Sequence, residues 1–157
     1  MISRISILFL LSLALPAWAQ HTPPPGIDPN ASFQPLPERK DVVSWKTLAQ
    51  VELVKQKDRY VPQFSKNVAA LDKKEVKVQG FMMPLEMGEK QSHFVLAAMP
   101  TTCAFCLPGG PESMVEVKMK TPVKYTFDAL VVSGKLTILK DDPSGIFYRI
   151  TDAEHSK

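Results

Sequence analysis

The chain has 157 residues, of which 45% are hydrophobic, a length and composition typical of one globular domain with a tail. Its 19 lysines and arginines against 16 acidic residues give a formal net charge of +3, and this weak excess is scattered along the chain. The charge pattern therefore gives no reason to expect an acidic partner, and without basic runs or a phosphate-cradling glycine loop, nucleic acid binding has no support.

The first 19 residues have the pattern of a cleavable secretory signal peptide. Arg4 is their only charge, Ile5 to Leu15 is an apolar run broken by two serines, and Ala17–Ala19 has the small-x-small pattern that signal peptidase reads. A membrane-spanning helix needs about twenty apolar residues, so this run is too short to persist as an anchor. We expect cleavage after Ala19, no stable membrane span afterwards, and a periplasmic location.

Residues 20–40 have the composition of a linker. Six of them are prolines and few are apolar. Proline lacks an amide donor and favours extended backbone, so we expect a flexible arm that leads to a folded domain.

Two stretches after the linker have helical spacing. In residues 41–58 apolar side chains recur every three positions, and Asp41 or Ser44 can cap the start. A second, shorter set follows and ends in a charged turn. The apolar positions are Trp45, Leu48, Val51 and Val54 in the first stretch, and Phe64, Val68 and Leu71 in the second. We expect a short helical region whose tryptophan packs into the core.

From Glu75 onward the apolar side chains alternate with a period of two, which is typical of β-strands. This pattern predicts a mainly β domain over residues 41–152, folded as a small OB-like (oligonucleotide-binding-type) antiparallel barrel, with a β-sandwich as the alternative. Residues 153–157 are expected to form a flexible tail. The expected strands cover residues 75–83, 92–99, 114–119, 124–132, 135–139 and 146–151, with turns at Gly134 and residues 141–145.

Both cysteines of the chain, Cys103 and Cys106, lie in one Cys-x-x-Cys motif. A c-type haem attachment site needs histidine directly after the second cysteine, and Leu107 stands there instead. A thioredoxin-like centre needs a helix at this point, but the Pro-Gly-Gly-Pro sequence of residues 108–111 prevents one. Both of these readings are therefore set aside.

Three interpretations of the cysteine pair remain. A structural disulfide suits an oxidising compartment, but a ring closed over so few residues stabilises the fold by only about 2 kcal/mol. A thiol–disulfide redox role follows from the general reactivity of such pairs. We favour metal binding, because a Cys-x-x-Cys turn places two thiolates on one side of a tight loop, as a zinc or copper half-site requires.

Two cysteines do not complete a metal site, and strand spacing narrows the choice of further ligands. Met99, Glu112 and Met114 flank the cysteine loop and are the candidate additional ligands. His93 precedes Met99 by roughly 20 Å of extended strand, so it is expected to lie too far away. A weaker second set at the opposite end of these strands comprises Met82, Met83, Met87, Glu86 and His93.

The stretch from Val78 to Glu86, the strand ending at Met99 and the segment from Cys103 to Glu112 resemble a family of uncharacterised exported bacterial proteins, catalogued as a domain of unknown function. The resemblance extends from Trp45 to Asp152. Related members carry Cys-x-His and prolines in place of this loop. The family is often lipid-anchored and encoded beside ABC transporters of the lipoprotein-releasing or macrolide-export type, and some members are linked to zinc limitation.

The resemblance implies an OB-like fold, a soft metal, and a partner among ABC transporters or other envelope proteins. This chain departs from the family pattern because it has no cysteine near Ala19 for lipidation.

No catalytic constellation emerges from the sequence. A Ser-His-acid triad would have to use His93, because His21 and His155 lie near the ends of the chain, and no nucleophile motif accompanies it. The sequence predicts a non-enzymatic periplasmic domain that binds a soft metal or an envelope partner through Cys103 and Cys106. A thiol–disulfide protein, or an interaction module with a structural disulfide, is the alternative.

Overall fold

The computed structural model describes residues 36–37, 39–100 and 109–156. The expected signal peptide, nearly all of the expected linker, and both cysteines lie outside these residues.

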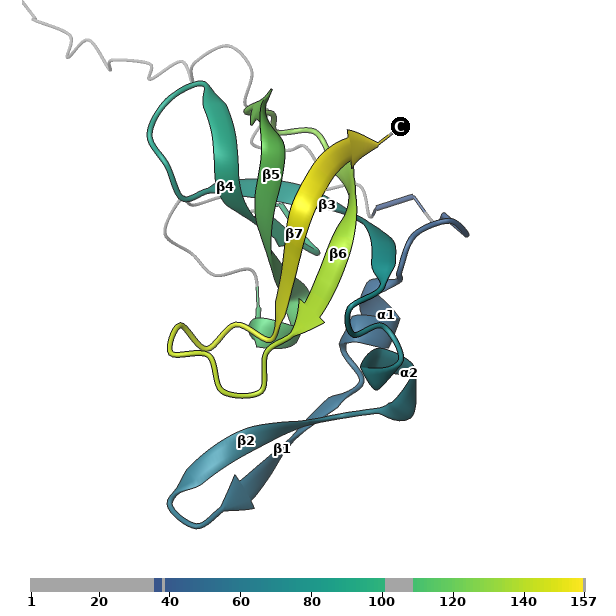
Figure 1. The fold of residues 1–157 in the computed structure, drawn as a ribbon, viewed down its shortest axis with the longest axis vertical. Helices are drawn as coiled ribbons and strands as arrows, with labels where there is room; N and C mark the ends of the chain where they lie inside the picture. Colours follow the sequence, from purple (N-terminus) through teal and green to yellow (C-terminus); the bar gives the residue numbers. More distant parts are fainter. Residues whose placement is uncertain (1–35, 38, 101–108, 157) are drawn as a thin grey trace, which may run out of the picture. The chain divides into compact units, whose positions relative to one another are not determined.

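Five strands close into a barrel, in the order β3-β4-β5-β7-β6 (Figure 1). All neighbours are antiparallel except β5 and β7, which run parallel. The predicted mainly β, OB-like barrel is confirmed, whereas an all-antiparallel barrel is not. A closed ring with an odd number of strands cannot alternate direction all the way round, so one pair must be parallel. The strands are β3 (Glu75–Pro84), β4 (Lys90–Ala97), β5 (Met114–Lys124), β6 (Leu130–Ile138) and β7 (Tyr148–Ser156).

Alternate side chains of these strands fill the barrel interior, as the period-two pattern predicts. The hydroxyl of the fully buried Tyr148 donates to the backbone carbonyl of Leu48, 2.6 Å away. Met83, Val95 and Met114 form a second apolar cluster, on positions that point away from this interior. The interior residues include Val78, Phe94, Leu96, Val115, Val117, Val132, Leu136 and Ile150.

The expected helix over residues 41–58 is wrong beyond its first turn. Helix α1 covers only Trp45–Leu48, capped by Ser44, and the chain then forms a hairpin of β1 (Val51–Gln56) and β2 (Arg59–Phe64). The apolar residues of β1 have the spacing of three that predicted a helix. In the structure, its valines and leucine pair with residues of β2 across the hairpin. The turn between the strands has Lys57 at a φ of 52°, a conformation that helices do not contain.

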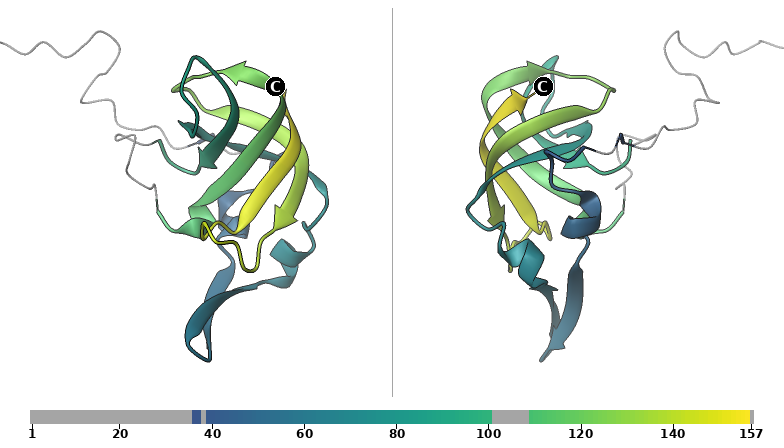
Figure 2. Two further views of the ribbon diagram at one scale, coloured as in Figure 1. Left: turned by 60° about the vertical axis from the view of Figure 1, so that its left-hand side comes forward. Right: turned by 90° about the vertical axis from the view of Figure 1, so that its right-hand side faces the viewer.

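The two helices lie at one end of the barrel, at the base of the β1–β2 hairpin, as Figure 2 shows. Leu48 of α1 and Val68 of α2 (Lys66–Ala69) are fully buried in the main core. Trp45 packs against that core and its indole Nε1 donates to the carbonyl oxygen of Gln79 at 2.8 Å. The expectation that the tryptophan serves packing is therefore confirmed. Across the described residues, neither helix nor any other has the length and apolar character needed to cross a membrane.

The later strands are longer and fewer than the sequence predicts. The expected turn at Gly134 is wrong, because strand β6 runs through this residue. A glycine stands here because strand β7 approaches too closely for a side chain: an added Cβ would lie 2.7 Å from Ile150 Cγ2 and 2.8 Å from the Thr151 carbonyl oxygen. Strand β7 continues to Ser156, so residues 153–156 belong to the barrel rather than to a tail. The expected turn over residues 141–145 is present between β6 and β7.

Candidate functional site

The loop with Cys103 and Cys106 joins β4, which ends at Ala97, to β5, which begins at Met114. The cysteines themselves lie outside the described residues. As predicted from the hairpin, the β3–β4 connection lies at the other end of β4, because the two strands pair in antiparallel register.

The three candidate additional ligands have different environments. Met99 follows β4 with 59% of its surface exposed. Glu112 is half-buried in the 3-10 helix η1 (Pro111–Ser113), with its carboxylate turned back over Gly110. Met114 is buried beside Met83 in the outer apolar cluster. Of the three thioether or carboxylate groups, those of Met99 and Glu112 remain accessible near the cysteine loop.

The weaker second set is not brought together as a metal site. Met82 is buried in the barrel interior, Met83 packs in the outer cluster, and Met87 is fully exposed. Within residues 36–37, 39–100 and 109–156, no three histidine, cysteine, aspartate or glutamate side chains gather in a way that could hold a metal ion.

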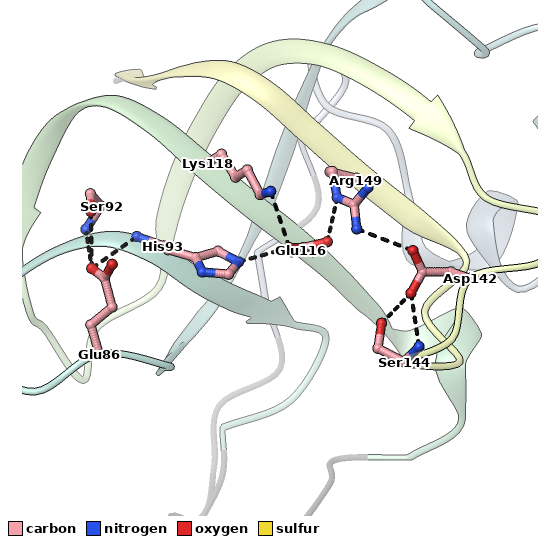
Figure 3. A network of polar contacts seen from close by, with 8 residues as sticks. All are labelled: Glu86, Ser92, His93, Glu116, Lys118, Asp142, Ser144 and Arg149. Carbon is pink, nitrogen blue, oxygen red and sulfur yellow. Dashed lines mark hydrogen bonds and ion pairs between the residues drawn. The ribbon is translucent and has the colours of Figure 1, made fainter.

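The structure instead reveals a network of ion pairs centred on Glu116 of β5 (Figure 3). The flanking residues Val115 and Val117 point into the core, so Glu116 points outward, yet only 7% of its side chain is exposed. His93 Nε2 of β4 lies 2.7 Å from Glu116 Oε1, and Arg149 Nε of β7 donates to Glu116 Oε2 at 2.5 Å. Three neighbouring strands are thus joined through one carboxylate.

The ionised form of Glu116 is stabilised by these contacts. Burial by itself raises the pKa of a carboxyl group, because it removes water from the charged form. At Glu116 the hydrogen bonds with His93 and Arg149 and the charges of Arg149 and Lys118 outweigh burial, so the pKa lies below its ordinary value. The hydrogen bond with Glu116 in turn raises the pKa of Arg149.

The network reaches a connecting loop on either side. In the β3–β4 connection, Glu86 accepts hydrogen bonds from the backbone N–H and hydroxyl of Ser92 and from the backbone N–H of His93, at 2.9–3.3 Å. In the β6–β7 connection, Asp142 accepts from Arg149 Nη2 at 3.2 Å and also holds Ser144. These hydrogen bonds lower the pKa of both carboxyl groups.

This position in the fold is the one that OB barrels use for ligands. Such barrels bind on the face of their second and third strands, between the loop that joins strands one and two and the loop that joins strands four and five. Here β4 and β5 are the second and third strands, and Glu86 and Asp142 stand in the two loops. We call the outward surface of β4, β5 and β7 around Glu116 the network face.

The network face differs from the nucleic acid surfaces of OB barrels. Those surfaces stack bases on aromatic rings along a basic groove. The described outward positions of β4 and β5 carry no phenylalanine, tyrosine or tryptophan, and Glu116 places a carboxylate at their centre. The expectation that this chain does not bind nucleic acid stays a prediction, which these side chains favour.

Sequence reasoning missed this network. His93 was considered as a metal ligand or triad member, whereas Glu116 and Arg149 were not singled out, because they are 33 residues apart and meet only through the parallel β5–β7 register. Glu116 sits between two valines, which marks it as an outward strand position but does not identify its partner. Only the barrel topology brings the two together.

Comparison with known proteins identifies a family without a described activity. A profile of the family described as "Protein of unknown function (DUF3299)" matches residues 18–148. A solved structure of a DUF3299 family protein from Pseudomonas aeruginosa PAO1 is similar at 20% sequence identity and a TM-score of 0.43, over 61% of this chain and 68% of that one. No functionally curated protein matches the chain. Because the profile spans most of the sequence, the chain belongs to the DUF3299 family of proteins of unknown function.

Proposed function

We propose that this chain is an exported, non-catalytic binding domain that holds a soft metal, zinc or copper(I), through Cys103 and Cys106. Export is supported by the signal-peptide pattern of the first 19 residues. Metal binding is supported by the Cys-x-x-Cys spacing, which presents two thiolates from one tight turn. The partner we propose is an envelope protein, such as an ABC transporter.

The observation that supports this proposal is the position of the cysteine loop in the sequence, between two strands of the barrel. It connects β4 to β5, the second and third strands, and so borders the surface that OB barrels use for binding. We propose that the metal is shared with, or presented to, a second protein that supplies further ligands.

Two described side chains are suited to complete the metal shell. Met99 offers an exposed thioether, which suits copper(I), and Glu112 offers a carboxylate, which suits zinc. Met114 is the weakest of the three candidates, because its thioether would have to leave the cluster that it forms with Met83 and Val95. The choice between Met99 and Glu112 therefore depends on the metal.

The test is metal binding by the full-length secreted protein with its thiols reduced and counted. Zinc and copper(I) affinities are measured by competition with a chromophoric chelator, in the wild type and in the Cys103→Ser and Cys106→Ser variants. Metal binding should fall sharply in either variant and should release protons in the wild type, since thiolates are the ligands. Met99→Leu is compared with Met87→Leu, a matched change at a fully exposed methionine in the β3–β4 connection.

Other outcomes would overturn the metal proposal. Protein isolated without metal and without free thiols, whose double Cys→Ser variant is less stable by only about 2 kcal/mol, would identify a structural disulfide. A bond that is readily reduced, with a high potential, would identify thiol–disulfide exchange.

A further inference from the structure

The network face exposes its cations and buries its anions. The side chains of the two cations, Lys118 and Arg149, are 52% and 27% exposed, whereas those of Glu116 and Asp142 are 7% and 13% exposed, and the imidazole of His93 beside them is 36% exposed. A partner that approaches the barrel from outside therefore meets basic groups first. This sorting of charge by depth is independent of the cysteine loop.

Both cations, and the imidazole of His93 beside them, retain hydrogen-bonding capacity. Among the described residues, Arg149 engages its Nε and Nη2 but not its Nη1, and His93 engages its Nε2 but not its Nδ1. Within the described part of the chain, the ammonium group of Lys118 has a single partner, Glu116, in an ion pair of 3.9 Å. Lys118 and His93 are direct cross-strand partners, and Arg149 is opposite Glu116, so the three groups lie on adjacent strands of one small area.

The buried carboxylates orient Arg149 and His93 before any ligand binds. A long side chain loses conformational freedom when it forms an exposed ion pair, and this loss usually cancels most of the gain. Here Glu116 and Asp142 already orient Arg149, and Glu116 already orients His93 (Figure 3). An incoming anion would meet preorganised donors and would pay less of that cost.

Apolar side chains are exposed in the β3–β4 connection, which Glu86 attaches to one edge of the network face. The β3–β4 connection begins directly after Pro84, which pairs with Phe94 next to His93, and it carries Leu85 and Met87, which are 50% and 100% exposed. Glu86, between these two residues, is bonded to Ser92 and His93, which holds the connection against β4. Exposed apolar groups beside oriented cations are typical of a protein-binding surface.

We infer that the network face binds a segment of a partner protein that presents carboxylate side chains to Lys118 and Arg149 and apolar side chains to Leu85 and Met87. An acidic peptide fits better than a polyphosphate or a lipid surface. The face has two cations, whose charge Glu116 and Asp142 partly offset, so it suits one or two separately placed carboxylates and disfavours a dense layer of phosphates. This inference goes beyond the metal proposal and does not depend on it.

The test uses the secreted full-length protein at low ionic strength with a chelator present, so that its outcome does not depend on metal. The probe is a fluorescein-labelled peptide that alternates glutamate and leucine, and its control carries glutamine in place of each glutamate. Fluorescence anisotropy should show binding of the acidic peptide only. Lys118→Gln should weaken that binding about threefold to fivefold, the range of a modest ion pair.

Lys135→Gln is the matched control, since it removes the same charge from an exposed position on β6, a strand that does not contribute to the network face. It should leave affinity unchanged, and Met87→Ser should weaken binding without changing its salt dependence. Equal binding of the two peptides, equal effects of Lys118→Gln and Lys135→Gln, or tighter binding to anionic lipid vesicles than to the acidic peptide would each overturn the inference.

Discussion

The hydroxyl of Tyr148 donates a hydrogen bond to the backbone carbonyl of Leu48, 2.6 Å away and 100 residues earlier in the chain. The bond joins the first residue of β7 to the last residue of helix α1, at the end of the barrel. It also gives a donor to a buried carbonyl group. Burial also raises the pKa of Tyr148, so its hydroxyl stays protonated and remains a donor.

Replacing Tyr148 with phenylalanine should therefore destabilise the domain by about 1–3 kcal/mol, because the Leu48 carbonyl would be left buried without a donor. The measurement is urea unfolding followed by tryptophan fluorescence, since Trp45 packs on the same core. Tyr60→Phe is the control, because Tyr60 is 66% exposed, and it should change stability by less than about 0.5 kcal/mol. Equal effects of the two changes would show that the hydrogen bond contributes nothing.

Replacing Glu116 with glutamine should also destabilise the domain, by about 1–3 kcal/mol near neutral pH, because Arg149 would lose the more buried of its two ionised partners. Glu154→Gln is the matched control. Glu154 pairs with Lys120 on the surface with 63% of its side chain exposed, so its replacement should cost less than about 1 kcal/mol.

Comparison of the wild type with Glu116→Gln also gives a prediction for the pH dependence of stability. The pKa of Glu116 is lower in the folded chain than in the unfolded chain, so its stabilising contribution is present above the unfolded value, about 4.3, and is lost as the pH falls through the folded value. As the pH falls from about 6 to about 3, a range that brackets this unfolded pKa, the free energy of unfolding should therefore decrease more for the wild type than for Glu116→Gln. Parallel stability curves for the two proteins would contradict the role given to this carboxylate.

Gly134→Ala tests the closeness of β6 and β7. The added methyl group would meet the Thr151 carbonyl oxygen and Ile150 Cγ2 at under 3 Å, so the two strands must shift, at a cost of about 1–3 kcal/mol. Thermal unfolding measured by circular dichroism is sufficient to detect this loss. Ser133→Ala, at the adjacent half-buried position, serves as the control and should be nearly neutral; an unchanged melting temperature for Gly134→Ala would show that the strands can separate freely.

Processing can be tested independently of the fold. We expect the mature protein to begin at Gln20 and to fractionate with soluble periplasmic contents, as shown by intact-mass measurement. Ala17→Tyr places a bulky residue in the cleavage signal and should cause the precursor to accumulate. Wild-type protein that retains Met1 and stays in the membrane fraction would refute the expected cleavage.

The elements that follow from the local pattern of apolar residues could be predicted from the sequence. The elements that depend on pairing between distant strands could not. Residues 75–83 alternate apolar and polar positions, and β3 forms there. Residues 51–56 have an apolar spacing that fits either a helix or a strand, and only pairing with β2 decides for the strand. Gly134 resembles a turn residue in the sequence because the close approach of β7 is a tertiary fact.

The candidate site divides in the same way. The cysteine pair is visible as a motif, and its interpretation as a metal site stays a prediction. The network face is invisible in the sequence because a charge count gives Glu116 and Lys118 equal weight, whereas the fold buries the first and exposes the second. The scattered net charge of +3 thus gave no sign of how the barrel sorts these charges by depth.

The strand order has a consequence for the time at which this domain can fold. Strand β7 lies between β5 and β6, and it comes last in sequence among the strands that the structure describes. A ribosome must therefore complete the C-terminal strand before the barrel can close, and until then β5 and β6 each lack a neighbour. Because contacts between distant segments also form slowly, the newly made chain spends a period without its native core. The proposed export would use that delay, since a secretion channel accepts an unfolded chain and not a closed barrel.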